Sequence, residues 1–231
     1  MEIILKSINL IFSLNVELYE IIFLSLKVSI TALIISVAIG TPISAVIAVN
    51  NFFGKKIIKV FFSSLMALPP VFVGLLLYII FSKSGPLGFF EILYTPSIMI
   101  LAQVIIILPI IISVNSENLE NLNQEYKDLF LIFRPSMSKK IFTILWDSRF
   151  KMFNSILVGL GRALSEVGAI IIVGGNIIHY TRVMTTTIAL ETAKGNLTLA
   201  MSLGIILIFI SLFLNLLALS IQHISRKNSY D

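Results

Sequence analysis

Five long runs of apolar residues limit what this chain can fold into more than any other feature. A helix that crosses a bilayer needs about 20 mostly apolar residues, and the runs meet that need at residues 19–49, 57–81, 96–114, about 152–173 and 199–221. With 57% hydrophobic and only 13% charged residues, the chain is too apolar for a soluble domain. The sequence therefore predicts an all-α integral membrane protein of the plasma membrane, in which residues 1–231 form one transmembrane domain with five transmembrane helices.

Residues 1–18 are also apolar, but they lack the features of a removable secretory signal. They carry Glu2, Lys6 and Glu17, and they have neither a basic start nor a small-residue cleavage site. We therefore expect this segment to remain in the mature protein and to lie at the membrane interface.

Lysine and arginine are distributed unequally between the two sets of breaks that separate the apolar runs. One set of breaks holds eleven of these residues and the other holds four. Short cytoplasmic loops carry the excess of basic residues, so the N-terminus is expected outside, and the C-terminus and the segment of about 117–149 in the cytoplasm. Topology also explains the net charge of +5 without nucleic-acid binding. The larger set comprises Lys55, Lys56, Lys59, Lys127, Arg134, Lys139, Lys140, Arg149, Lys151, Arg226 and Lys227.

The hydrophilic segment between the third and fourth runs must lie in water, because so many charges are expensive in hydrocarbon. Its apolar residues recur every three or four positions, as on one side of a helix, and Pro135 predicts two short helices joined by a bend. Two interpretations remain open: a solvated loop packed against the protein's own helices, or a helix that enters a groove of a cytoplasmic partner. The candidate contact residues are Glu125, Asp128, Leu129, Phe133, Arg134 and Met137.

Polar residues and prolines inside the apolar runs predict local features of the spans. Pro69 and Pro70 lie near the middle of the second run, where neither can donate a helical hydrogen bond, so a hinge is expected there. Gln103 and Asn215 are expected to make hydrogen bonds between helices. Lys27 is expected either to make such a hydrogen bond or to extend its ammonium toward the membrane surface.

Arg162 and Glu166 lie four residues apart within the fourth run, so both face the same side of a helix and can pair. One interpretation is a self-neutralising pair that fixes the helix against its neighbours. The other is that Arg162 supplies positive potential along the path of a dianion, while Glu166 orients it. Ser165, between them, most simply permits close helix approach.

The polar stretch after the fourth run contains further candidate residues. Gly174, Gly175 and Asn176 can form a turn whose backbone N–H groups point at an anion, and Asn176 joins Arg162, Ser165 and Glu166 as a candidate of the translocation path. Downstream lies a cluster of side-chain donors. It is either a solvated helix on the membrane surface or a gate or docking site for an external protein; its members are Arg182, Thr185, Thr186 and Thr187.

The sequence lacks the residue patterns of several chemistries. It contains no cysteine, and His179 and His223 do not have the spacing of metal ligands. A glycine-rich nucleotide loop with its lysine is also absent from the sequence. We therefore expect no metal, cofactor or catalytic residue, and the energy for any active transport has to come from another subunit.

Several short motifs resemble the tungstate-specific branch of the molybdate, tungstate and sulfate permeases, the membrane subunits of ABC importers. They include Leu68-Pro69-Pro70-Val71-Phe72-Val73-Gly74-Leu75, Gly161-Arg162-Ala163-Leu164-Ser165-Glu166-Val167-Gly168-Ala169 and Thr181-Arg182-Val183-Met184-Thr185-Thr186. With Ser82 to Gly88, Gly174 to Ile177 and Ile188 to Gly195, they extend the resemblance over nearly the whole chain after about residue 20. The resemblance implies a second copy of this chain, a cytoplasmic ATPase dimer and an extracytoplasmic oxyanion-binding protein as partners.

The same resemblance places the family's coupling motif in the hydrophilic segment. The best register puts Asp128 in the glutamate position, Arg134 in the glycine position and Ile144 in the isoleucine position, while Leu129 and Phe130 replace two alanines. The resemblance therefore implies a cytoplasmic coupling helix between the third and fourth spans.

Alternative functions remain open from the sequence. Nothing in spacing or charge separates tungstate from molybdate or sulfate, which are dianions of similar shape. A self-sufficient channel or ion-coupled carrier is the alternative of a different class. That alternative expects an ion relay and inverted repeats. Apart from Glu20 at the very start of the first run, Glu166 is the one acidic residue inside a run, and five spans divide poorly into repeats.

Overall fold

A computed structural model describes residues 2–13 and 15–227, with the side chains of residue 218 and of residues 221–227 excepted. The side chains of His223, Arg226 and Lys227 therefore lie outside the described part of the chain. The described backbone is helical with short connections. Its elements are α1 (Glu2–Phe12), α2 (Val16–Val49), α3 (Lys55–Leu65), α4 (Pro70–Phe81), the 3-10 turn η1 (Gly88–Phe90), α5 (Pro96–Glu125), α6 (Lys127–Phe133), α7 (Met137–Asp147), α8 (Arg149–Ser165), α9 (Gly168–Gly174), α10 (Met184–Ala193) and α11 (Leu197–Lys227).

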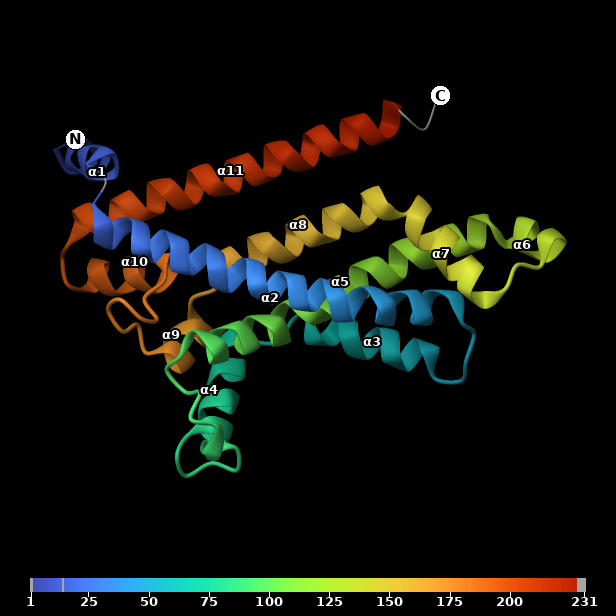
Figure 1. Cartoon of the computed structure of the whole chain (residues 1–231), viewed down its shortest axis with the longest axis horizontal. Helices are drawn as coiled ribbons and strands as arrows, with labels where there is room; N and C mark the ends of the chain where they lie inside the picture. Colours follow the sequence, from blue (N-terminus) through green and yellow to red (C-terminus); the bar gives the residue numbers. More distant parts are fainter. Residues whose placement is uncertain (1, 14, 228–231) are drawn as a thin grey trace.

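The long helices α2, α5, α8 and α11 run roughly along the long axis of the molecule (Figure 1). At one end lie α10, the loop that precedes it and the start of α2; we call this the α10 end. At the other end, the α6 end, lie α6, α7 and the connection between α2 and α3. The functional residues gather at the two ends and at one break between them.

Close packing of α5 between α2 and α8 forms the centre of the bundle. Ile107 and Ile111 of α5 are fully buried there. Glycines of the neighbouring helices allow this approach, since an added Cβ at Gly40 of α2 would lie 2.9 Å from Ile111 Cγ2 and one at Gly159 of α8 would lie 3.1 Å from Ile107 Cγ2. Small residues at helix contacts are the usual means of tight packing in membranes.

The structure confirms long apolar helices but not the exact number of spans. In the described residues, α2, α5 and Leu197–Leu217 are each long and apolar enough to cross a membrane. Two bent helix pairs bring the count to five if each pair is one span: α3 with α4, at an angle of 94°, and α8 with α9, at 57°. Pro69 and Pro70 stand at the first bend, as predicted. The second bend corrects the expectation of a continuous fourth span.

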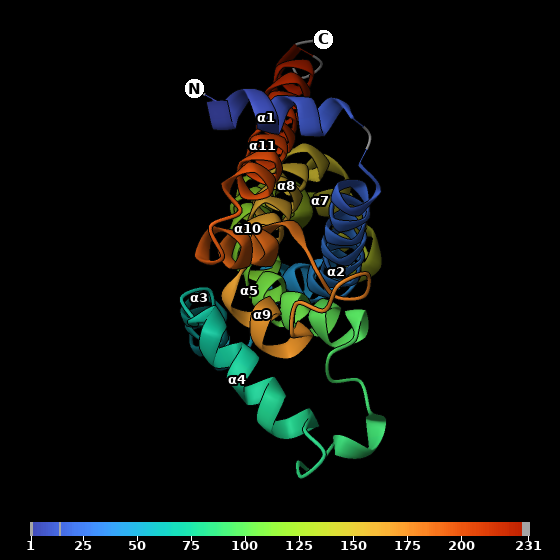
Figure 2. The same cartoon turned by 90° about the vertical axis from the view of Figure 1, so that its left-hand side faces the viewer.

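One predicted boundary also moves, and the N-terminal segment takes a defined position. The third span was expected to end at residue 114, but α5 continues to Glu125, so the first part of the hydrophilic segment extends that helix. Residues 2–12 form α1, which crosses α11 (Figure 2). Ser7 of α1 donates a hydrogen bond to the Thr198 carbonyl at 3.0 Å, so α1 is held against the start of α11.

Helix α4 projects sideways from the bundle, as the second view shows (Figure 2). Its inner side packs on α9, with Val73 and Leu77 buried beside Ala169. Its outer side is apolar and uncovered in the described chain: the exposed fraction is 46% at Leu75 and 54% at Ile79. The first bend of the chain therefore carries an apolar arm, α4, that rests on α9.

Replacing Gly74 with alanine should loosen the contact between α4 and α9. The added Cβ would lie 2.8 Å from the Ala169 Cα and 3.0 Å from its carbonyl oxygen. Overpacking of this kind costs about 1–3 kcal/mol, so the midpoint of thermal unfolding of the purified protein should fall.

The matched control for this test is Gly161→Ala, because a Cβ at Gly161 meets nothing within 4 Å in the described part of the chain. Alanine favours a helix over glycine by about 0.5–1 kcal/mol, so the control should unfold at the same temperature or higher. Equal midpoints for the two variants would show that the α4–α9 contact is not tight.

Candidate functional site

The break between α8 and α9 is the centre of the first candidate site. The Glu166 side chain is only 4% exposed and accepts a hydrogen bond from the Ala169 N–H in the first turn of α9, at 3.2 Å. Its other carboxylate oxygen lies 3.5 Å from the Arg162 guanidinium. A carboxylate at the start of one helix and a cation in the last turn of the preceding one both complement the helix dipoles. Glu166 therefore stabilises the break that it occupies.

Gln103 of α5 adds a donor to a backbone carbonyl at the end of α8, that of Ala163, which also accepts from the Glu166 N–H at 3.4 Å. Its amide donates to the Ala163 carbonyl at 3.0 Å and to the Ser29 hydroxyl of α2 at 3.4 Å. Its side-chain oxygen is buried and has no hydrogen-bond partner among the described residues. Beside it lies a cavity of about 10 Å³, lined in part by Ser25, Ser29 and Glu166, close to the volume needed for one water molecule, about 10–15 Å³.

The structure confirms the pairing of Arg162 with Glu166, but the two residues have different environments. Glu166 is buried, whereas 36% of the Arg162 side chain is exposed. Ser165 is exposed, and its hydroxyl donates to the Arg162 carbonyl at 3.1 Å. The break therefore presents a cation at the surface of the protomer and keeps the counter-charge inside.

Helix α10 is attached to this break and to α2. Thr185 donates to the Glu166 carbonyl at 2.7 Å, and the Met184 N–H donates to the Ser25 hydroxyl at 2.7 Å. Thr186 and Thr187 are fully buried, and the Thr187 hydroxyl bonds the Val183 carbonyl at 2.7 Å. A direct docking contact by Thr186 or Thr187 would need an exposure that they lack in this protomer.

The turn at Gly174, Gly175 and Asn176 is formed, but its donors are largely used within the chain. Gly175 and Asn176 have φ values of 68° and 49°, and the Asn176 amide oxygen accepts from Thr186 at 2.9 Å. The Gly175 N–H bonds the Ile171 carbonyl, and the Ile177 N–H bonds the Thr181 hydroxyl. Of the N–H groups considered for an anion, that of Gly175 is therefore already occupied, and so is the N–H of the next residue, Ile177.

Two ion pairs, each with one buried and one half-exposed member, hold α10 and its loop at both ends. Arg182 is 6% exposed and donates to Glu17 of α2 at 3.1 Å. Glu191 accepts from Lys194 at 3.1 Å and from Asn196 at 2.9 Å. Burial raises the pKa of Glu191, but these two donors and the positive charge of Arg182 outweigh it and hold the pKa below its ordinary value of 4.5. Glu191 thus stays ionised and joins α10 to the start of α11.

The second candidate site is at the α6 end, where the structure confirms two short helices with a bend. Helices α6 and α7 are separated at Arg134, which has a left-handed backbone with φ 43°. None of the α6 residues is buried, and the exposed fraction reaches 74% at Ile132 and 76% at Phe133. The other candidate contacts are exposed as well: Glu125, Asp128, Leu129, Arg134 and Met137.

The opposite side of this pair of helices is anchored to the bundle. Ile144 of α7 is fully buried among residues of α2 and α5, including Ala48 and Leu122. Phe130 packs on the same cluster and lies under the Lys140 ammonium, 5.1 Å from the ring centroid. The apolar side of α6 therefore faces away from the protein's own helices, which favours the groove-binding interpretation over a loop packed on the bundle.

Sequence reasoning missed several polar partners that the structure brings together. Ser25 and Ser29 are four residues apart on α2, a spacing that signals one helix face, yet nothing in the sequence named their partners. Asn115 and Ser155 share a buried hydrogen bond of 2.6 Å between α5 and α8. Among the described residues, no group of His, Cys, Asp and Glu could hold a metal ion.

Residues 40–228 match the family described as the inner membrane component of binding-protein-dependent transport systems. The chain belongs to this family. As a permease with several membrane-spanning helices, it is a multi-pass protein of the plasma membrane.

Three relatives give a finer comparison for the permease. It is 37% identical over 205 residues to a protein of Haloferax volcanii named "Probable anion ABC transporter permease protein", covering 87% of this chain and 88% of the relative. It is 36% identical over 216 residues to the "Tungstate uptake system permease protein TupB" of Peptoclostridium acidaminophilum, covering 94% and 95%. A Campylobacter jejuni protein of the same name is 40% identical over 161 residues, covering 70% and 67%.

Replacing Gln103 with leucine should destabilise the break between α8 and α9, because it removes the shorter of the two hydrogen bonds to the Ala163 carbonyl, the one that comes from α5. Hydrogen bonds between membrane helices are worth about 0.6–2 kcal/mol, so thermal unfolding should begin at lower temperature. Asn215→Leu is the control, since the Asn215 amide donates to Ser211 within its own helix at 2.9 Å. Indistinguishable melting curves for Gln103→Leu and wild type would contradict the role of Gln103.

Proposed function

We propose that the chain is the membrane subunit of an ATP-driven importer for an oxyanion, with tungstate as the substrate. The match to binding-protein-dependent permeases over residues 40–228 carries the proposal of import through a partner complex. The names of two relatives, at 36% and 40% identity, support tungstate over molybdate or sulfate.

The exposed apolar side of α6 supports coupling to a cytoplasmic ATPase dimer. Exposed apolar residues in water favour burial against a partner, and a helix with such a face fits a groove on the motor subunit. Because α7 anchors the pair to α2 and α5 through Ile144, a push on α6 reaches the spans directly. The chain itself has no nucleotide loop, so the motor supplies the energy.

The orientation follows from the basic residues. The segments that carry most of the larger set of lysines and arginines lie together at the α6 end (Figure 1), which we assign to the cytoplasm. The α10 end then faces outward, toward the oxyanion-binding protein. A second copy of the chain completes the assembly, and the apolar arm of α4 supplies a surface for it.

We assign the translocation path to the break between α8 and α9. Arg162 offers a partly exposed cation to a passing dianion, while Glu166 holds the guanidinium in place; Ser165 and Asn176 stand at the same break and at the turn that follows α9. The external gate is proposed at α10, because Thr185 links it to Glu166 and Arg182 links its loop to α2. Thr186 and Thr187 contribute to that gate from inside, by holding the fold of α10.

A direct test is tungstate uptake by proteoliposomes that contain the permease with its ATPase and an oxyanion-binding protein. Uptake should require all three proteins and ATP, and tungstate should be preferred to molybdate and sulfate. Uptake by vesicles that contain the permease without the ATPase would replace the importer with the channel or carrier alternative.

Replacing Phe133 with aspartate should uncouple the permease from its motor, because a charge would enter the apolar groove that we propose on the ATPase. ATP-driven uptake and co-purification of the ATPase should both fall at least about tenfold. Since Phe133 is 76% exposed, the unfolding temperature of the permease alone should not change. Phe133→Leu keeps an apolar side chain and should retain both activities; normal coupling in the aspartate variant would refute the assignment.

Arg162→Ala should abolish uptake while assembly with the ATPase survives, because the positive potential along the path is lost. Arg162→Lys, which keeps a charge, should recover part of the activity. If Arg162 serves only to fix Glu166, the alanine variant should instead lose thermal stability, and uptake should fall in proportion to the folded protein. Normal uptake by Arg162→Ala would remove the residue from the path.

A further inference from the structure

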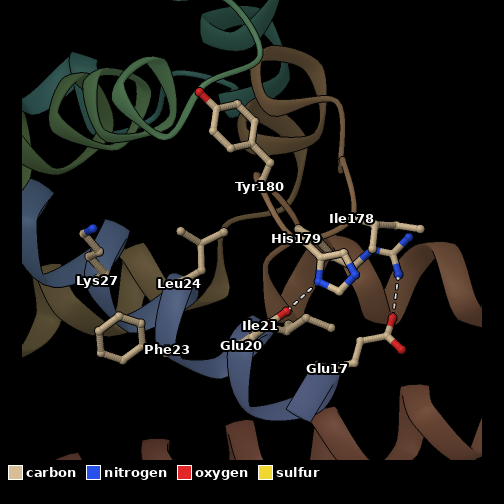
Figure 3. A pocket seen from close by; sticks show the side chains of 10 residues that line it. Glu17, Glu20, Ile21, Phe23, Leu24, Lys27, Ile178, His179 and Tyr180 are labelled. Atoms are coloured by element: carbon tan, nitrogen blue, oxygen red, sulfur yellow. Dashed lines mark hydrogen bonds and ion pairs between the residues drawn. The ribbon is translucent and has the colours of Figure 1, made fainter.

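A cavity of about 260 Å³ opens between the first part of α2 and the loop that precedes α10 (Figure 3). On α2 it is lined by Glu17, Glu20, Leu24 and Lys27, and on the loop by His179 and Arg182, with aromatic rings at its edges. Ligand pockets for drug-sized molecules are typically about 300–1,000 Å³. This cavity therefore suits a small polar group.

The charged side chains that line the cavity differ between its two ends. At one end, Glu17 pairs with Arg182 at 3.1 Å, and Glu20 lies 2.6 Å from the His179 ring. At the other end, Lys27 has no ion pair among the described residues. The first end holds two carboxylates and one guanidinium, and the other end holds the Lys27 ammonium.

The position of Lys27 on α2 coincides with the boundary of the hydrocarbon. Residues 28–49 carry no charge and match the length of about 20 residues that spans a bilayer. Glu20 lies seven residues earlier, which is about 10 Å farther along the helix at 1.5 Å per residue. The flexible stem of Lys27 lets its ammonium rise toward the headgroup level, and Tyr180 beside the cavity is a residue type of the membrane interface.

We infer that this cavity binds the headgroup of a zwitterionic phospholipid that carries a primary ammonium. The phosphate, which lies deeper in the leaflet, pairs with Lys27, and the ammonium, which lies farther out, pairs with Glu20 and Glu17. Charge-assisted hydrogen bonds form at both ends. The exposed Phe23 and the half-buried Leu24 lie between Glu20 and Lys27 along α2, beside the two carbon atoms that join the ammonium to the phosphate.

The arrangement of charges also favours this headgroup over the oxyanion and over other lipid headgroups. A dianion such as the transported oxyanion would meet two carboxylates at the outer end and one lysine at the inner end. An anionic headgroup without an ammonium would leave Glu17 and Glu20 facing a negative charge, and like charges at contact distance disfavour binding. A trimethylated ammonium cannot donate hydrogen bonds to Glu20. The order of preference is therefore phosphatidylethanolamine, then phosphatidylcholine, then phosphatidylglycerol.

The test is native mass spectrometry of the purified full-length permease, with each of these three lipids added in turn. The wild type should retain phosphatidylethanolamine most strongly. Lys27→Ala should lower the apparent affinity for this lipid about tenfold. Glu20→Gln should reduce the preference for phosphatidylethanolamine over phosphatidylcholine while leaving the phosphate contact. Lys83→Ala, an exposed lysine outside the cavity, is the matched control and should change neither.

Several outcomes would overturn the inference. They are equal retention of phosphatidylethanolamine by wild type and Lys27→Ala, preferred retention of phosphatidylglycerol, and displacement of the lipid by tungstate or sulfate. Loss of lipid binding in a dimeric permease would show that a second copy covers the cavity instead. If Lys27→Ala does not fold, the Glu20→Gln variant decides. An unchanged preference for phosphatidylethanolamine over phosphatidylcholine in that variant would then overturn the inference.

Discussion

A backbone polar group in hydrocarbon must find a partner inside the protein, and this constraint explains how the two bent helix pairs persist. At the first bend, Pro70 begins α4, where a missing N–H is tolerated. The second bend has no proline, so side chains supply the missing partners: Glu166 accepts from α9 and Gln103 donates to the end of α8. The second bend thus forms without a proline. Hydrogen bonds of Glu166, at the break, and of Gln103, from α5, stabilise it.

These bonds connect the elements that we propose to move. The carbonyl of Glu166 accepts from Thr185 of α10, and α10 is joined to α2 through Ser25. At the far end, Ile144 fixes the helices of the coupling segment to α2 and α5. Helices α2 and α5 therefore touch both the motor side and the break. Force on α6 has a continuous route to the proposed gate through packed helices, without any flexible linker between them.

Local sequence was enough to predict three features. The apolar runs predicted the long helices, the two prolines predicted the first bend, and Pro135 with the periodic apolar residues predicted the two short helices of the hydrophilic segment. Each of these depends on local periodicity or on a residue that cannot continue a helix. The break at Glu166 was missed because Val167 and Gly168 do not forbid a helix, and part of what stabilises it is a hydrogen bond from Gln103, which is distant in the sequence. Thr186 and Thr187 looked like surface donors, yet their burial depends on packing that periodicity does not reveal. The direction of α4 depends on its contact with α9, which is also absent from local sequence.

The exposed face of α6 has a consequence for how the cell makes this protein. Phe133 and Ile132 project into water with three-quarters of their surface uncovered, which is an aggregation liability until another protein shields them. A permease synthesised in excess of its motor would expose this patch to chaperones and proteases. With the coupling that we propose, balanced production of the two kinds of subunit is therefore expected from one helix of seven residues.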